Sequence, residues 1–84
     1  MTNHHPDRHL LNHAHVEDRA TYQQVHQRMI RHAGDKINNP LVRHAVRIAV
    51  DYAFAVSAGH ERHAAFLLRR YERITSNLGY DPLA

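Results

Sequence analysis

Four residues near the N-terminus have the types and the spacing of metal ligands. His5, His9, His13 and Glu17 follow one another at intervals of four. On a continuous helix this spacing stacks the side chains along one stripe, and a histidine pair at i and i+4 can bridge one transition-metal ion. The stripe equally suits a solvated helix face in a chain with ten histidines, and the cysteines of a closed zinc site are absent. We therefore predict no structural metal and no cofactor, and these four residues are the candidates if a metal binds.

A second group with recognition chemistry lies further along the chain, and we call it the arginine face: Arg62, Phe66, Arg69, Arg70 and Arg73. On a helix, three of the arginines project away from the apolar side, the aromatic ring falls among them, and Arg70 lies alongside. Arginine forks bind carboxylates and phosphates, while an exposed ring can enter a partner's pocket or stack on a base. The pattern favours contact with an acidic protein surface or with nucleic acid.

The arginine face also has a purely structural interpretation. Phe66 would then pack beneath a neighbouring helix, while the arginines pair with Glu61, Glu72 or solvent. The two interpretations differ in the exposure of the Phe66 ring. We expect that ring to be substantially exposed if the face is functional.

Catalytic chemistry finds little support in the sequence. Apart from the tyrosines, the hydroxyl nucleophile candidates are Thr2, Thr21, Ser57, Thr75 and Ser76. None of them lies in a nucleophile motif, and three glycines in the whole chain form no phosphate-binding loop. A histidine placed beside Asp51 by the fold is the one catalytic pairing left open. We predict that the protein is not an enzyme.

Length and composition predict one helical domain over residues 1–84. Hydrophobic residues make up 43% of the chain, and only three glycines and three prolines interrupt it. The formal net charge of +3 is small for a dedicated nucleic-acid binder. The absence of cysteine fits a cytoplasmic protein. Charged residues break the longest apolar run, so we expect no membrane span.

The first helix is expected over residues 7–33, after a partly frayed, histidine-rich segment at about 1–6. Gly34 suits a left-handed position just after this helix. Asp18, however, would fall in the middle of the apolar face. The alternative is a break near residues 16–18, with Glu17 or Asp18 capping a new helix.

The second and third helices are expected over 40–57 and 60–77, which completes an all-α, three-helix bundle-like domain. Asn39 and Pro40 are a preferred N-cap and first helical residue, and Gly59 separates the two helices. The competing interpretation joins them into one helix of about 38 residues, nearly 57 Å long. We favour two helices.

The 40–57 helix has an apolar arc about 220° wide, roughly twice what one partner layer covers. Two short flanking helices leave part of such an arc uncovered, which predicts a homodimer. The residues expected in intra-chain or inter-chain packing are Val42, Val46, Ala49, Val50, Ala53 and Val56.

Together these patterns predict a small, non-enzymatic helical module that acts as a regulatory, adaptor or inhibitor protein through protein–protein contacts. The alternative is a nucleic-acid-binding accessory protein that uses the arginine face. A third interpretation is a metal or pH sensor based on the N-terminal histidines, because imidazoles gain charge near pH 6.5.

Overall fold

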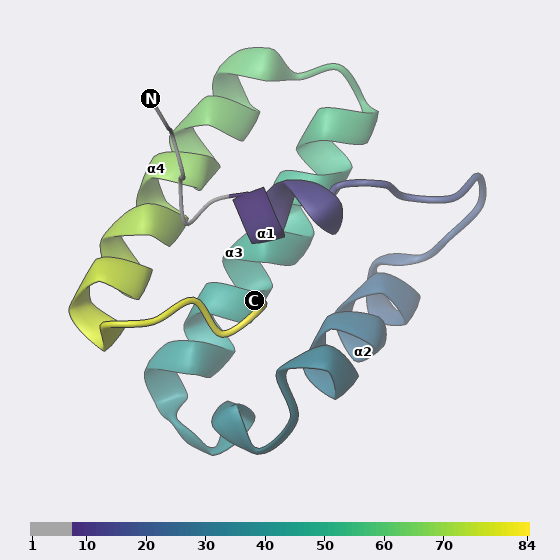
Figure 1. Cartoon of the computed structure of the whole chain (residues 1–84). Helices are drawn as coiled ribbons and strands as arrows, with labels where there is room; N and C mark the ends of the chain where they lie inside the picture. Colours follow the sequence, from purple (N-terminus) through teal and green to yellow (C-terminus); the bar gives the residue numbers. More distant parts are fainter. Residues whose placement is uncertain (1–7) are drawn as a thin grey trace.

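The long apolar helix lies at the centre of the molecule, with the other segments arranged around it (Figure 1). The computed structural model describes residues 8–84, which contain helices and no strand. Their order is α1 (Arg8–Asn12), α2 (Tyr22–Ala33), a 3-10 helix η1 (Gly34–Asn38), α3 (Pro40–Ser57) and α4 (Glu61–Leu78). The predicted all-α class is confirmed.

α3 begins and ends where the sequence predicts. The side chain of Asn39 accepts a hydrogen bond from the backbone N–H of Leu41 at 2.9 Å, and Pro40 occupies the first helical position. Arg43 donates to the carbonyl oxygens of Ile37 and Asn38, which fixes η1 against this helix end.

α3 and α4 are separate helices, as we favoured. Gly59 has a φ of +76° in the turn between them, a conformation that glycine adopts without the steric cost of a side chain. α4 ends at Leu78, and the Gly79 that follows it adopts the left-handed conformation common at helix C-termini. The chain therefore reverses between Ser57 and Glu61, and α4 packs back along α3 (Figure 1).

The expected continuous helix over 7–33 is wrong. α1 ends at Asn12, and residues 13–21 form a non-helical linker before α2. The new helix starts at Thr21, whose hydroxyl accepts from the Gln24 N–H while the Gln24 side chain accepts from the Thr21 N–H. The break leaves the carboxylate of Asp18 exposed, whereas a continuous helix would have turned it towards the core. A break was the alternative interpretation, but its cap is Thr21 and not Glu17 or Asp18.

The buried apolar side chains form one cluster around α3. α2 contributes Val25, Met29 and Ala33, and α1 adds Leu10. α4 contributes Ala64, Leu67, Tyr71 and Ile74. Four helices thus share the core in place of the predicted three.

The segment of residues 80–84 completes the core. It turns back from the end of α4 and crosses the molecule (Figure 1), and both Pro82 and Leu83 are fully buried. Leu83 belongs to the same apolar cluster as α3, and its carbonyl oxygen lies within hydrogen-bond distance of His32.

Candidate partner-binding surface

The arginine face lies on the side of α4 that points away from α3. Its four arginines are exposed, and Phe66 keeps 48% of its surface in contact with solvent. Ala64, Leu67, Tyr71 and Ile74 are turned into the core, so the arginines and the buried apolar residues lie on different sides of the helix. The expected exposure of Phe66 is therefore present.

The Phe66 ring contacts its neighbours along the same helix. The His63 ring stacks on it, with 6.4 Å between centroids and 15° between planes. The guanidinium of Arg70 lies 5.8 Å from the ring centroid, a cation–π contact. His63 precedes Phe66 by about one helical turn and Arg70 follows it by about one turn, so the ring has contacts on both sides along the helix.

The arginines of this face are not paired with carboxylates. In the part of the chain that the structure describes, their guanidinium groups form no ion pair or hydrogen bond, and Arg70 alone contacts a ring. The arginines therefore pair with neither Glu61 nor Glu72 and are exposed to solvent, which the structural interpretation also allowed. Four arginines against two glutamates leave α4 with an uncompensated positive surface.

The residues expected at a dimer interface lie inside the single chain. Five of them are completely buried, and only Val56 is exposed, at 40% of its surface. The buried five are Val42, Val46, Ala49, Val50 and Ala53. The apolar excess of α3 consequently gives no reason for self-association, and the expected homodimer, which no observation here tests, loses the argument on which it rested.

The stripe of metal-ligand candidates is not formed as one helix face. His5 and the side chain of His9 lie outside the described residues. α1 ends before His13, so Glu17 does not follow it by one helical turn. The Nε2 atom of His13 lies 3.3 Å from the Leu83 carbonyl oxygen, and within the described residues no cluster of three ligand side chains occurs.

His13 instead belongs to a polar contact that the sequence did not reveal. The Nε2 atom of His32 lies 3.1 Å from the same Leu83 oxygen, and the two rings meet edge to face with centroids 4.7 Å apart. Burial lowers the pKa of His13, and the charge of His32 acts in the same direction. Residues 13 and 83 are distant in sequence, so no local pattern could indicate this pairing.

A second polar contact joins α4 to the 80–84 segment. The Tyr71 hydroxyl donates to Oδ1 of Asp81 at 2.6 Å, and the same oxygen accepts from the Leu83 N–H at 2.9 Å. Burial raises the pKa of Tyr71, and the bond to the Asp81 carboxylate raises it further. These bonds hold the segment in place, and they involve none of the residues of the arginine face.

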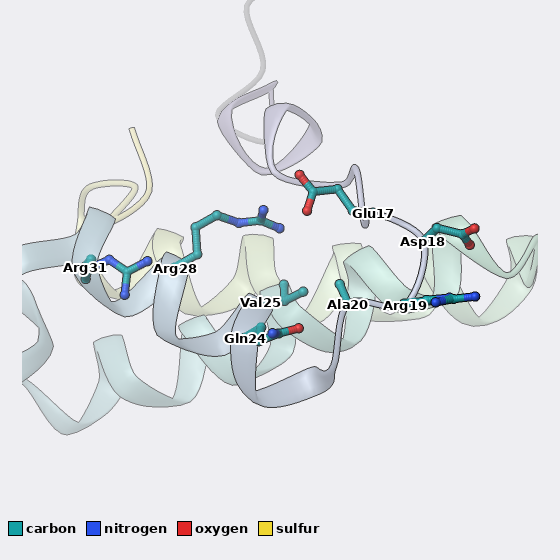
Figure 2. Close-up of a pocket in the computed structure, with 8 residues that line it drawn as sticks. All are labelled: Glu17, Asp18, Arg19, Ala20, Gln24, Val25, Arg28 and Arg31. Atoms are coloured by element: carbon teal, nitrogen blue, oxygen red, sulfur yellow. The ribbon is translucent and has the colours of Figure 1, made fainter.

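A polar cavity of about 440 Å³ lies between the 13–21 linker and α2 (Figure 2). The Glu17 carboxylate points towards the guanidinium of Arg28, whereas Asp18 and Arg19 point away from the centre. Carboxylates and guanidinium groups are mixed, so the cavity selects neither anions nor cations. Its lining contains no hydroxyl or imidazole that could act as nucleophile or base: Glu17, Asp18, Arg19, Ala20, Gln24, Val25, Arg28 and Arg31.

Two further findings concern membrane-spanning helices and similarity to known proteins. Among residues 8–84 no helix is both long enough and apolar enough to cross a bilayer. No protein-family model, curated protein or solved structure matches the chain.

Proposed function

We propose that this protein is a non-enzymatic binding module that acts as a regulatory, adaptor or inhibitor protein, and that the arginine face contacts an acidic surface of another protein. The proposal includes a cytoplasmic location, which the absence of cysteine supports. It assigns recognition to Arg62, Phe66, Arg69, Arg70 and Arg73.

The supporting observation is a half-exposed phenylalanine among four arginines that have no carboxylate partner within the described chain. An unpaired guanidinium retains all of its donors for a partner, and it binds a carboxylate through two parallel hydrogen bonds. Aromatic and arginine side chains are also the residues that contribute most to binding at protein interfaces. In the described residues, Phe66 and these arginines form no polar or ring contact with any element other than α4.

The surroundings of Phe66 favour a protein over nucleic acid as the partner. Stacking on a base requires access to the face of an aromatic ring. Here the His63 ring stacks on Phe66 and the Arg70 guanidinium lies over it, so a stacking base would compete with neighbours from the same helix. Phe66 still keeps 48% of its surface exposed, and an apolar pocket of a protein can receive it.

Fluorescence anisotropy with two labelled probes tests the proposal. One probe is a synthetic peptide with alternating glutamates around one phenylalanine, and the other is a short duplex DNA. We expect the peptide to bind more tightly than the duplex at physiological salt. The double variant Arg69→Glu/Arg73→Glu should lose at least tenfold in peptide affinity while its circular dichroism stays unchanged.

The control is Arg19→Glu/Arg31→Glu, which changes the net charge equally on exposed residues of the linker and α2. It should retain peptide binding. Equal losses of peptide affinity in the two double variants would mean that binding depends only on net charge. That result would contradict the arginine face as a specific binding surface. Tighter binding of the duplex, with a steep decrease in affinity as salt rises, would establish the nucleic-acid alternative.

A further inference from the structure

A second cavity adjoins the arginine face. It has a volume of about 340 Å³ and lies where the C-terminal half of α3 meets the start of α4. Its lining residues are Asp51, Phe54, Ala55, Ala58, His60 and His63. The volume is near the lower end of the roughly 300–1,000 Å³ found for small-molecule pockets, so it suits one large side chain.

His63 forms a shared boundary between this cavity and the arginine face. Its ring lines the cavity and also stacks on Phe66. A chain lying along α4 over Phe66 would therefore have the cavity directly beside it. The two features form one continuous surface.

The walls of the cavity are mostly apolar and firmly placed. Phe54 is half-buried and stacks on Tyr22, with 5.8 Å between centroids and 19° between planes. Ala55 and Ala58 add methyl groups, and Asp51 is the one carboxylate in the lining. Such walls favour an apolar side chain, since burying a charged one beside them is costly.

The arginines restrict the kind of chain that can supply this side chain. From Arg62 to Arg73 the face extends about 16 Å along α4 at 1.5 Å per residue, which matches a short peptide segment. Its unpaired positive charge attracts carboxylates. An occupant with an apolar side chain flanked by acidic residues therefore complements both parts of the surface.

We infer that the Asp51–His63 cavity is the anchor pocket of the partner-binding surface, and that it receives one large apolar side chain from an acidic segment of a partner protein. This inference rests on the proposed function. It adds the requirement that the acidic segment carry an aromatic or branched aliphatic residue at a fixed place.

Two peptides and two variants test the pocket separately from the charges. The peptides contain the same glutamates around a central phenylalanine or a central alanine. Ala58→Phe fills the cavity from an exposed position, and Ala65→Phe adds the same ring on an exposed position of α4 outside the cavity lining. We expect wild type to bind the phenylalanine peptide about tenfold more tightly or better. Ala58→Phe should remove that preference and Ala65→Phe should keep it.

The outcomes separate the two claims. If Ala58→Phe keeps the preference while Arg69→Glu/Arg73→Glu abolishes binding, the pocket inference fails and the proposed function stands. If neither peptide binds wild type, both fail. Nuclear magnetic resonance of wild type gives a second readout, because the phenylalanine peptide should shift the signals of the Ala55 and Ala58 methyls and the His60 ring. Shifts confined to Phe66 and the arginines would contradict the inference that the cavity receives the phenylalanine side chain.

Discussion

At the scale of single residues, the carbonyl oxygen of Leu83 is the point where distant segments meet. The Nε2 atoms of His13 and His32 lie 3.3 and 3.1 Å from it. A carbonyl oxygen only accepts, so each imidazole must carry its proton on Nε2 to bond there. Further protonation would place positive charge on two rings whose centroids are 4.7 Å apart. Acidification therefore acts directly on the contact that holds the 80–84 segment.

The first prediction is a loss of stability at low pH through His13. Burial lowers its pKa, as do the charges of His32 and Arg28, while the Leu83 carbonyl and Asp81 oppose the shift. The unfolded chain then takes up a proton near pH 6.5 and the folded chain only at lower pH. The contribution of neutral His13 to the free energy of unfolding should therefore be fully present above about pH 6.5. The free energy of unfolding should decrease as the pH falls below that value.

Urea unfolding at about pH 7.5 and about pH 5.5 measures this dependence. His13→Gln is the informative variant because its amide can still donate to Leu83 but does not titrate. It should show a weaker decrease in the free energy of unfolding between the two pH values than wild type. An identical decrease in both proteins would assign the effect to other histidines.

The second prediction concerns the bond between Tyr71 and Asp81. Tyr71→Phe removes the donor at 2.6 Å from Oδ1, while Oδ2 of the same carboxylate is already buried without a partner. The variant should lose about 1–3 kcal/mol of unfolding free energy, because the carboxylate keeps its burial and loses a donor. Tyr80→Phe, at an exposed tyrosine, is the matched control and should unfold like wild type. A comparable loss in the control would contradict this assignment.

At the scale of elements, the third prediction concerns the start of α2. Thr21→Ala removes the hydroxyl that accepts from the Gln24 N–H, but keeps the backbone N–H that donates to the Gln24 side chain, and should cost about 1 kcal/mol. Thr21→Ser retains the hydroxyl and should cost less. Equilibrium unfolding compares the three proteins. Equal stability of Thr21→Ala and wild type would show that the Thr21 hydroxyl contributes nothing to the free energy of unfolding.

The elements also show how far local patterns determine the fold. The bounds of α3 were predictable because Asn39, Pro40 and Gly59 each act within a few residues of their position. The break before α2 was expected only as the alternative, near residues 16–18, since the spacing of apolar residues continues across the 13–21 linker and suggests one face. Its cap, Thr21, was not identified. Arg19 in that linker has a φ of +69°, which a non-glycine residue rarely adopts and which no sequence pattern indicated.

At the scale of the whole molecule, the fourth prediction is that α3 is covered within one chain. Val46 is fully buried, so Val46→Asp should lose more than about 3 kcal/mol through burial of an unpaired charge. Val56→Asp changes an exposed valine of the same helix and should cost about 1 kcal/mol or less. Chemical unfolding of the two variants separates these cases.

Protein concentration provides a second measurement of the same point. If α3 needed a second copy for coverage, the melting temperature of wild type would rise between low and high micromolar concentration. We expect it to stay constant. A melting temperature that rises with protein concentration would show that the protein self-associates through α3 or another surface.

The whole-molecule view explains why the homodimer argument failed while the arginine face was correctly placed. The exposed side of α4 follows from spacing within eighteen residues. The core around α3 also includes Leu83, which joins it only after the chain has turned back beyond the end of α4. The exposed residues of α4 were therefore predictable from local sequence, whereas the positions of His32, Asp81 and the cavity beside His63 required the complete fold.

The position of the arginine face, apart from every contact that closes the core, has a consequence for how this protein can change. Substitutions at Arg62, Arg69 or Arg73 remove no bond on which the fold depends. New binding preferences can therefore arise there without compensating mutations elsewhere. If the arginine face binds partners as proposed, related chains with different partners should share Tyr71, Asp81 and Leu83, which stabilise the fold. They should differ along the exposed side of α4, where the partner is bound.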